Sequence, residues 1–350
     1  MAIVRLRNAD RSFEIQGNET LLEAAIREGV GLPYGCSAGN CGLCRARLIE
    51  GELKPTRHHD FVFTQAERAH GDFLMCSNGA QTDLTLEVVL EKDPTSIPWQ
   101  TLQAKVKIAE KLGERLLWLK LRVPRSQRLR FMAGQYATLT LENGAVSDSA
   151  IASCPCDERH VDFHIRRLPD DDFSDSAFES LRPGQIVTVE APGGRFAFDD
   201  SSTRPALFVA FDTGFAAIKS MLEHLTARES EQPLHLYRIC CGKEDLYMHN
   251  LCRSWADALD ELSYTPLVIE ESFSEWAKDE LSGMEKVETM LRRVMEDHPD
   301  LSGMDLYVCA PEPVVERFDA LAMQHQLVRE QFHAEVIRGN SYTRCLGATA

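Results

Sequence analysis

Four cysteines near the start of the chain restrict its fold more than any other feature of the sequence. Cys36, Cys41 and Cys44 are separated by four and by two residues, and Cys76 follows in a short apolar segment. Glycines between them let the backbone adopt positive φ and turn its N–H groups towards the sulfur atoms. Two irons bridged by two sulfides need four thiolates that converge on one small volume. The segment therefore predicts a 2Fe–2S cluster with these four cysteines as ligands.

A structural zinc site and a C-x-x-C redox pair are the two alternatives for these cysteines. Zinc sites favour pairs of the form C-x2-C, and a redox pair would need neither Cys36 nor Cys76. The four-then-two spacing is that of plant-type ferredoxins, whose cluster carries electrons. Electron transfer is therefore the function that the sequence indicates most strongly.

Composition limits the compartment and the partners of the chain. Its 350 residues suggest two or three domains, and its longest apolar runs are far shorter than a membrane span. Eleven cysteines without a signal-peptide segment indicate reducing surroundings. A net charge of −16 argues against nucleic acid, which needs clustered Lys and Arg. We expect a soluble, cytoplasmic protein that binds neither nucleic acid nor a membrane.

The rest of the chain shows two different periodic patterns of apolar residues. Segments such as LWLKLRV (117–123) and YATLTLE (136–142) alternate apolar and polar residues, which predicts an antiparallel barrel. Later, apolar strands such as ALFVAF (206–211) and LYVCA (306–310) alternate with helical patterns, which predicts a doubly wound parallel sheet. The fold class is thus multidomain α+β. The expected segments are residues 1–91, a linker over 92–100, a barrel over 101–202, an α/β domain over 203–338, and a tail over 339–350.

This order of segments resembles the single-chain NAD(P)H reductases of bacterial oxygenases, which are members of the ferredoxin–NADP reductase superfamily. The resemblance covers nearly the whole chain. It is carried by FMAGQY (131–136), VDFHIRRLP (161–169), LRPGQIVTVEAPGGRF (181–196), TGFAAIKSMLEHL (213–225), HPDLSGMDLYVCAPEP (298–313) and EQFHAEV (330–336). It implies a β-grasp ferredoxin domain, a flavin-type barrel and a nucleotide-type α/β domain. In such enzymes a hydride passes from nicotinamide to FAD, and single electrons then pass through the cluster to an oxygenase or a further ferredoxin.

The residues that hold FAD in this family are missing. The family motif R-x-Y-S aligns with Ser147, Ser149 and Ala150 at its Arg, Tyr and Ser positions. A Gly-Gly pair that presents N–H groups to the FAD phosphates aligns with Asp170 and Asp171. A carboxylate about 4 Å from a phosphate costs roughly 1 kcal/mol in water and several times more at a half-buried site. We therefore expect weakened FAD binding.

The nicotinamide side has diverged as well. The family loop G-G-T-G aligns with Phe211, Asp212, Thr213 and Gly214, so its last two residues alone are kept. Phe211 removes a glycine that lets the backbone approach, and Asp212 is expected to set a negative charge near the cofactor phosphates. Thr213 and Gly214 are the candidate cofactor-binding residues. Cys309 is the candidate catalytic residue if the nicotinamide site works.

Three functions follow from this pattern. The favoured one is electron transfer through the cluster without efficient NAD(P)H oxidation, in exchange with a redox protein such as a ferredoxin or an oxygenase. The second keeps FAD and NAD(P)H and makes the chain a flavoprotein reductase of an oxygenase system. The third is a redox sensor whose cluster state is read by a regulatory protein. Only the second is an enzyme.

Seven further cysteines lie outside the cluster set, and two of them stand as Cys154-Pro-Cys156 directly after the altered flavin motif. These two could hold a metal or form a redox pair, but the favoured interpretation is small buried apolar side chains in a reduced protein. The histidines His58, His59 and His164 are interpreted as loop or strand residues and not as ligands.

Overall fold

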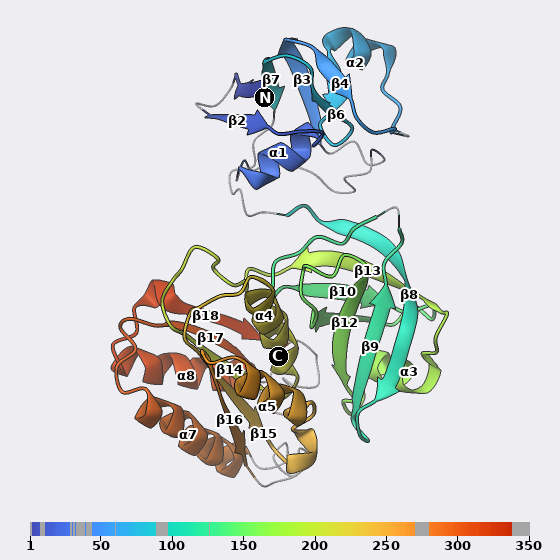
Figure 1. Cartoon of the computed structure of the whole chain (residues 1–350). Coiled ribbons are helices and arrows are strands. Elements are labelled where there is room, and N and C mark those ends of the chain that lie inside the picture. Colours follow the sequence, from blue (N-terminus) through green and yellow to red (C-terminus); the bar gives the residue numbers. More distant parts are fainter. Residues whose placement is uncertain are drawn as a thin grey trace. The chain divides into compact units, whose positions relative to one another are not determined.

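The computed structural model describes residues 2–7, 11–28, 30, 32, 39, 44–59, 61–88, 97–125, 127–269 and 280–337. The chain divides into two compact units (Figure 1). The first comprises Met1–Leu102, Val123–Phe131 and Glu190–Pro192, and the second comprises Gln103–Arg122, Met132–Val189 and Gly193–Ala350. Each unit is considered by itself below. The segment boundaries expected from the sequence stay predictions.

The first unit contains a five-stranded mixed sheet in the order β2-β1-β7-β3-β5. Its strands are β1 (Ala2–Leu6), β2 (Arg11–Ile15), β3 (Arg45–Glu50), β5 (Asp72–Leu74) and β7 (Leu84–Val88). Helices α1 (Leu21–Arg27) and α2 (Gln65–His70) and the pair β4 (Leu53–Pro55) and β6 (Asn78–Ala80) complete it. Alternate side chains of β1, such as Val4 and Leu6, are buried, and Leu21 and Leu22 of α1 join the same core. A sheet with one buried face and a covering helix is the result.

The antiparallel barrel that the alternating pattern predicts belongs to the second unit, except for short parts of two of its strands, Gln100–Leu102 and Glu190–Pro192. Its six strands follow the order β11-β10-β13-β8-β9-β12, and a bridge from Ile151 to Phe163 nearly closes the ring. The elements are β8 (Gln100–Lys111), β9 (Leu116–Arg122), β10 (Tyr136–Thr140), β11 (Val146–Ala150), β12 (His160–Arg166), α3 (Asp172–Ser180) and β13 (Ile186–Gly193). Leu117, Leu119 and Leu121 of β9 are buried, whereas Trp118 and Lys120 between them are partly exposed. The barrel is confirmed.

The parallel sheet of the second unit is also confirmed, with the strand order β16-β15-β14-β17-β18. Its strands are β14 (Ala206–Phe211), β15 (Leu234–Cys240), β16 (Leu262–Val268), β17 (Asp305–Ala310) and β18 (Phe332–Val336). Its helices are α4 (Phe215–Ala227), α5 (His249–Ala258), α7 (Glu280–Asp297) and α8 (Glu312–Gln324), with short 3-10 turns η1 (Asp212–Gly214), η2 (Lys243–Asp245) and η3 (Arg329–Gln331). Every residue of β14 and β17 is buried, because helices cover both faces of the sheet.

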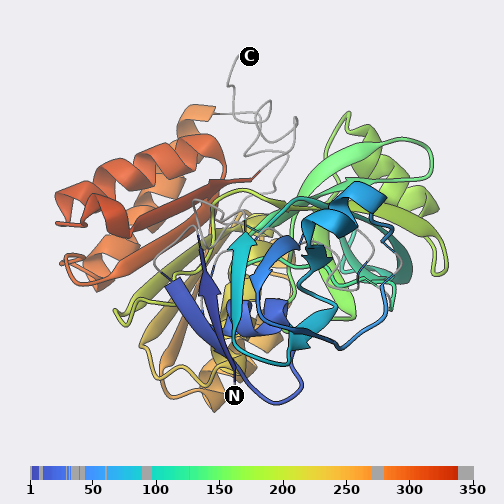
Figure 2. The same cartoon turned by 90° about the horizontal axis from the view of Figure 1, so that it is seen from above.

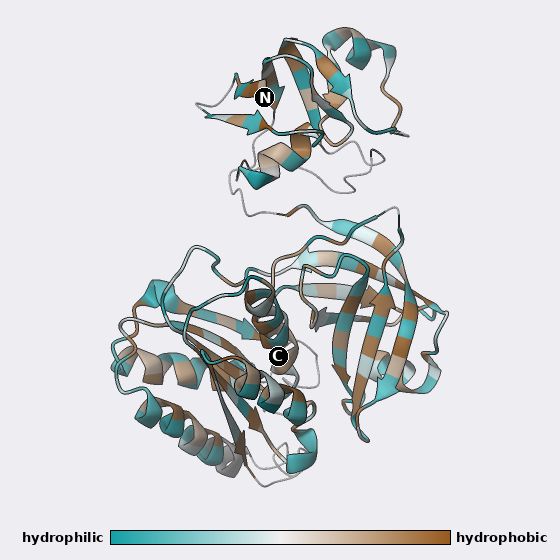
Figure 3. Ribbon diagram, in the orientation of Figure 1, coloured by the Kyte–Doolittle hydropathy of each residue, from teal (hydrophilic) through white to brown (hydrophobic). Residues whose placement is uncertain are grey.

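Two apolar cores flank this sheet. Helices α7 and α8, orange and red in Figure 2, contribute Val287, Leu291 and Phe318 to one core. Helix α4 contributes Ile218 to the other core, which also contains barrel residues such as Phe196. In Figure 3 apolar residues are dense along the central strands. A shared core therefore fixes the barrel against the parallel sheet within this unit. No helix in the described part of the chain is long and apolar enough to cross a membrane.

Candidate functional site

Two of the four predicted cluster ligands lie in the described part of the first unit. Cys44 precedes β3 and Cys76 follows β5, and both are almost fully buried. The N–H of Met75 donates to the carbonyl of Cys44 at 3.0 Å, so the third and fourth cysteines are held next to each other. Cys36 and Cys41 lie outside the described residues. Residues far apart in sequence thus meet where four thiolates would have to converge.

Gly39, between the first two cysteines, occupies a position that only glycine fits. Its φ is +81°, and a Cβ there would lie 2.4 Å from the Cβ of His59. Both observations are what a tight loop around a small inorganic cluster requires. The residues of the described part therefore fit a 2Fe–2S cluster.

A cleft in the second unit separates the barrel from the parallel sheet. It encloses about 680 Å³ of empty space, its open mouth included. The barrel wall is formed by β10, β11, β12 and the start of α3, and the opposite wall by η1, the start of α4, and the ends of β17 and β18. The lining residues are Tyr136, Ser147–Ala150, His164–Arg166, Leu168, Asp171, Phe173, Ser174, Thr213, Gly214, Ala216, Cys309 and Glu335–Ile337.

The cleft brings together most of the positions at which the sequence departs from the family motifs. Ser147, Ser149, Ala150 and Asp171 line the barrel wall. Three retained positions, namely Thr213, Gly214 and Cys309, line the opposite wall. Residues of the flavin motif and of the nicotinamide motif thus line one cavity, as both alignments require.

The start of α3 is occupied by an acidic side chain of the chain itself. Asp171 is the N-cap residue, and its Oδ1 accepts a hydrogen bond from the N–H of Ser174 at 2.6 Å. Asp170 has a φ of 54°, the conformation that a glycine adopts without strain. A helix N-terminus attracts phosphate because its first N–H groups lack partners. Here one of those donors is already bound to a carboxylate.

Ser147 does not replace the arginine of the family motif. Its hydroxyl donates to the carbonyl of Asp148 in the same strand at 3.3 Å. Among the described lining residues, Arg166 is the one with a permanent positive charge, whereas Asp148, Asp171 and Glu335 are acids. Since a pyrophosphate is an anion, the described residues do not fit FAD through the contacts that the family uses.

Arg166 is itself neutralised by two buried carboxylates. Its Nη1 lies 2.6 Å from Oδ1 of Asp245, and its Nη2 donates to Asp212. Asp212 is not among the described residues that line the cleft, and its side chain is only 2% exposed. The expectation that Asp212 presents its charge to cofactor phosphates is therefore corrected, because Arg166 compensates that charge. Phe211 packs into the core of the sheet.

On the opposite wall of the cleft, the backbones of η1 and β17 lie close together. A Cβ on Gly214 would lie 2.2 Å from the carbonyl oxygen of Cys309, so glycine is required there. Burial, reinforced by the Glu335 carboxylate, raises the pKa of the Cys309 thiol well above its usual value. Cys309 is thus a neutral thiol and not a thiolate nucleophile.

His164 is a strand residue, as expected, but it lines the cleft and belongs to a buried polar group that the sequence did not reveal. The Nδ1 of His164 lies 3.0 Å from the Tyr247 hydroxyl, and the guanidinium of Arg238 stacks on Phe215 at 4.0 Å. Burial, followed by the charges of Lys219 and Arg238, lowers the pKa of His164 well below its ordinary value. His164 is therefore neutral. Its partners lie tens of residues away, so no local pattern could reveal them.

The interpretation of Cys154 and Cys156 as separate buried thiols is wrong. Their sulfur atoms are joined in a disulfide. Cys154 is buried, but Cys156 is exposed. Two cysteines with one residue between them can meet only if the loop turns sharply, and the proline between them favours such a turn.

Comparison with known families agrees with this architecture. Residues 4–78 match the family model described as a 2Fe-2S iron-sulfur cluster binding domain. Residues 103–198 match the model described as an oxidoreductase FAD-binding domain. Together they span the predicted cluster loop and the whole barrel wall of the cleft.

Relatives that match over nearly their whole length include proteins named as reductases. The chain is 28% identical over 332 residues to the CDP-6-deoxy-L-threo-D-glycero-4-hexulose-3-dehydrase reductase of Yersinia pestis, covering 95% of this chain and 97% of that one. It is 26% identical over 327 residues to the reductase component of propane 2-monooxygenase from Gordonia sp., with coverages of 92% and 93%.

Solved structures with a similar fold include the cytochrome P450 reductase GcoB of Amycolatopsis, with a TM-score of 0.61 at 23% identity. The ferredoxin reductase in carbazole 1,9a-dioxygenase gives a TM-score of 0.57 at 22% identity. Each comparison covers 96% of this chain and 98% of the other. At these identities the comparisons establish the fold.

Proposed function

We propose that the chain is a member of the ferredoxin–NADP reductase superfamily with an N-terminal 2Fe–2S domain, and that it exchanges electrons with a protein partner through that cluster without holding FAD tightly. Cys36, Cys41, Cys44 and Cys76 would hold the cluster, which supplies one-electron chemistry.

The observation that carries this proposal is the hydrogen bond from Ser174 N–H to Asp171 at the start of α3. A phosphate placed there would have to displace a carboxylate that is covalently part of the same turn. Ser147 also stands at the position of the family arginine, which would provide one of the strongest contacts available to a phosphate, and does not supply that contact. Since each 1.4 kcal/mol changes affinity tenfold, the loss of two such contacts reduces FAD affinity by several orders of magnitude.

The partner that fits this function is a redox protein of the cytoplasm, either a ferredoxin or an oxygenase. Relatives over the whole chain include reductase components of propane 2-monooxygenase and of terephthalate 1,2-dioxygenase. The second unit would then act as a docking body for that partner.

A second candidate function is a working FAD-dependent NAD(P)H reductase. It is favoured by the wall opposite Asp171, which keeps Thr213, Gly214 and Cys309 and where Gly214 lies close to Cys309. On this alternative FAD is held through contacts other than the family motif, and Cys309 lies against the nicotinamide.

Flavin content distinguishes the two functions. The full-length protein is reconstituted anaerobically with iron and sulfide, incubated with excess FAD, desalted and denatured, and the released FAD is compared with iron. We expect iron with far less than one flavin per cluster, and no bleaching of the cluster by NADH or NADPH while dithionite bleaches it. One flavin per cluster together with rapid reduction by a nicotinamide would establish the reductase instead.

A further inference from the structure

The loop from β11 to β12 contains a disulfide in a chain whose other described cysteines carry no such bond. Cys240, Cys241, Cys252 and Cys309 are buried thiols. Burial raises the pKa of Cys240 to about 12 and also raises the pKa of Cys252, so these thiols are protonated and inert. A protein with buried thiols and predicted iron–sulfur ligands is suited to reducing surroundings. In such surroundings a disulfide is usually transient and redox-sensing.

The two sulfur atoms of this disulfide differ in access. Cys154 is only 5% exposed, whereas Cys156 lies at the surface of the loop. The N–H of Cys156 donates to the Cys154 sulfur at 3.1 Å. A hydrogen bond to sulfur favours the thiolate form, and a sulfur that is more stable as a thiolate is the better leaving group. An incoming thiolate would therefore attack Cys156 and release Cys154.

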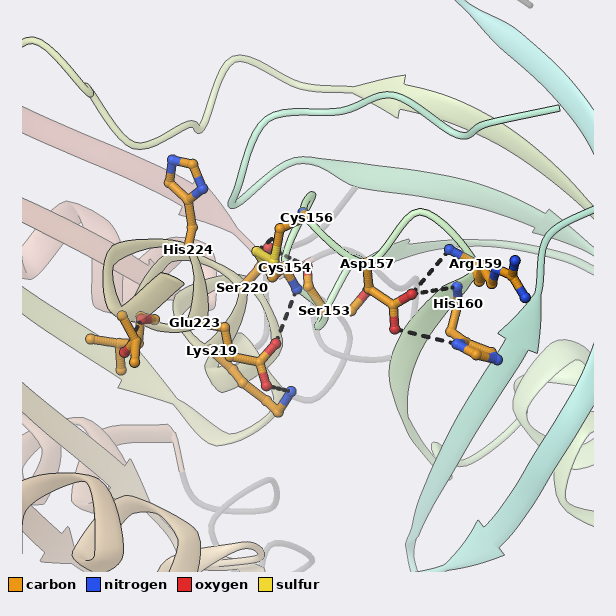
Figure 4. Close-up of a disulfide and its surroundings, with 12 residues drawn as sticks. Ser153, Cys154, Cys156, Asp157, Arg159, His160, Lys219, Ser220, Glu223 and His224 are labelled. Atoms are coloured by element: carbon orange, nitrogen blue, oxygen red, sulfur yellow. Dashed lines mark hydrogen bonds and ion pairs between the residues drawn. A yellow bond between two sulfur atoms is a disulfide. The ribbon is translucent and has the colours of Figure 1, made fainter. Parts of the chain in front are cut away.

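The backbone before the pair is fastened to α4 without help from either sulfur (Figure 4). The Nζ of Lys219 donates to the carbonyl of Ala152 at 3.0 Å, and the hydroxyl of Ser220 donates to the carbonyl of Ser153 at 2.7 Å. The N–H of Cys154 donates to Oε2 of Glu223 at 3.0 Å. None of these three bonds involves a sulfur atom.

The backbone after the pair is fastened as well. The carboxylate of Asp157 accepts hydrogen bonds from the N–H groups of Arg159 and His160, each at 3.0 Å. Because both flanks are fixed by bonds that do not involve sulfur, the two cysteines remain close together after reduction. They can therefore open and close repeatedly, with no need for unfolding.

We propose that Cys154 and Cys156 are a redox-active dithiol–disulfide pair that exchanges with thiols outside the protein. A thiolate attacks the Cys156 sulfur, the bond to Cys154 breaks, and Cys154 leaves as a thiolate that takes a proton from water. A second external thiol then attacks the mixed disulfide, releasing Cys156 as a thiol and forming an external disulfide. The protein gains two electrons and two protons, and two external thiols lose them. This activity is separate from the cluster and does not require FAD.

Differential alkylation of the full-length protein tests the proposal. The air-purified protein is treated with reduced glutathione or with buffer alone, quenched in acid, alkylated and digested. The mass of the peptide that contains Cys154 and Cys156 is then measured by mass spectrometry. We expect no label on either cysteine after buffer and two labels after glutathione, because structural disulfides resist glutathione and redox-active ones do not. Two labels without glutathione would show that no disulfide exists. No label after glutathione would show that the bond is structural.

Single variants test the assigned roles of the two sulfurs. Cys154→Ser leaves the exposed thiol, and Cys156→Ser leaves the buried one. With glutathione disulfide, Cys154→Ser should form a mixed disulfide about tenfold or more faster than Cys156→Ser, because access limits thiol exchange. Cys252→Ser, which removes a buried thiol elsewhere, should behave as the wild type. Equal rates for the two loop variants would overturn the assignment of Cys156 as the attacked sulfur. The alkylation test uses the wild-type protein alone, so it does not depend on whether a variant folds.

Discussion

The carboxylate of Asp171 lies 2.6 Å from the N–H of Ser174 and occupies the first turn of α3. The N-terminus of a helix carries a partial positive charge and free N–H donors, which is why anions bind there. In this chain the anion is supplied by the protein itself. The barrel thus keeps the helix and the cleft while an internal ligand takes up part of the phosphate site.

Restoring the family residues in the cleft should restore flavin binding. The variant combining Ser147→Arg, Ser149→Tyr, Asp170→Gly and Asp171→Gly is expected to bind FAD at least about tenfold more tightly, since it adds a charge-assisted contact and removes two carboxylates. Equilibrium dialysis against FAD measures the change. Asp170→Gly alone is the matched control, because Asp170 is not among the described lining residues. An unchanged affinity in the fourfold variant would mean that the motifs are misaligned.

The substitutions Asp170→Gly and Asp171→Ala should change the free energy of unfolding in opposite directions. Asp170 has a φ of 54°, and a left-handed conformation costs a residue other than glycine roughly 1 kcal/mol. Asp170→Gly is therefore expected to raise the free energy of unfolding by up to that amount, measured by urea denaturation. Asp171→Ala should lower it by about 1 kcal/mol, because the N-cap hydrogen bond is lost. Equal effects of the two substitutions would contradict the cap.

Substitution of Arg166 should lower the free energy of unfolding far more than substitution of its partner Asp212. Arg166→Met leaves two buried carboxylates without their cation, which costs about 3–5 kcal/mol. Asp212→Gly removes one carboxylate, relieves a φ of 47°, and leaves Arg166 bound to Asp245, so its cost should be clearly smaller. Urea denaturation of both variants measures the difference. A larger loss for Asp212→Gly would show that the two acids do not share the charge of Arg166.

Local patterns predicted much of this protein, and long-range contacts supplied the rest. The spacing of Cys36, Cys41 and Cys44 and the period of the strands are local. The period correctly predicted the barrel and the parallel sheet, whereas the cluster ligands inferred from the spacing stay a prediction. The pairing of Asp212 with Arg166 joins residues 46 positions apart, and that of His164 with Tyr247 joins residues 83 positions apart. Such pairs depend on how two sheets pack. The sequence therefore indicated the negative charge of Asp212 but not the ion pair with Arg166 that compensates it.

The error at Cys154 and Cys156 has a different origin. The pair is local, but sequence spacing does not reveal whether a loop turns enough to join its sulfur atoms, nor which sulfur is exposed. The two residues before the pair, Ala152 and Ser153, accept hydrogen bonds from Lys219 and Ser220 of α4, which lie far along the chain. The expectation of reduced thiols, which came from composition, is confirmed for the described buried cysteines outside this loop. It is wrong for Cys154 and Cys156, which lie in the loop between β11 and β12.

Stability should fall as the pH drops below 6.5, and His164 should contribute to that fall. Its ordinary pKa of 6.5 applies to the unfolded chain, whereas burial lowers the pKa in the folded protein. Below pH 6.5 the unfolded chain therefore binds a proton that the folded protein does not, which favours unfolding. Between pH 6.5 and 5.5 this amounts to about 1 kcal/mol for one histidine.

His164→Gln should remove that contribution. The difference in unfolding free energy between pH 6.5 and 5.5 is expected to shrink by about 1 kcal/mol relative to the wild type, as measured by urea denaturation at both pH values. His58→Gln, at an exposed histidine, is the control and should leave the difference unchanged. His235, whose pKa is lowered to about 4 mainly by burial, is present in all three proteins and cancels. A pH dependence in His164→Gln equal to that of the wild type would refute the assignment.

The cluster should depend on Cys76 and be indifferent to Cys309. In Cys76→Ser the fourth thiolate next to Cys44 is lost, so iron content and visible absorbance after reconstitution should drop severely. Cys309→Ser alters the cleft of the other unit and should retain full iron. Iron and sulfide analysis of the two variants gives the result. Full iron in Cys76→Ser would exclude Cys76 as a ligand.

Gly214 tests whether the cleft wall at η1 and β17 depends on a close backbone approach. A Cβ at this position would meet the carbonyl oxygen of Cys309 at 2.2 Å, and backbone atoms cannot move aside cheaply. Gly214→Ala is therefore expected to lower the free energy of unfolding by about 1–3 kcal/mol. Gly303→Ala is the matched control, because a Cβ there meets nothing within 4 Å and its φ is not positive. Thermal unfolding of both variants decides: if Gly214→Ala were as stable as Gly303→Ala, η1 would not be packed against Cys309, and the wall that carries Thr213 would be wrongly placed.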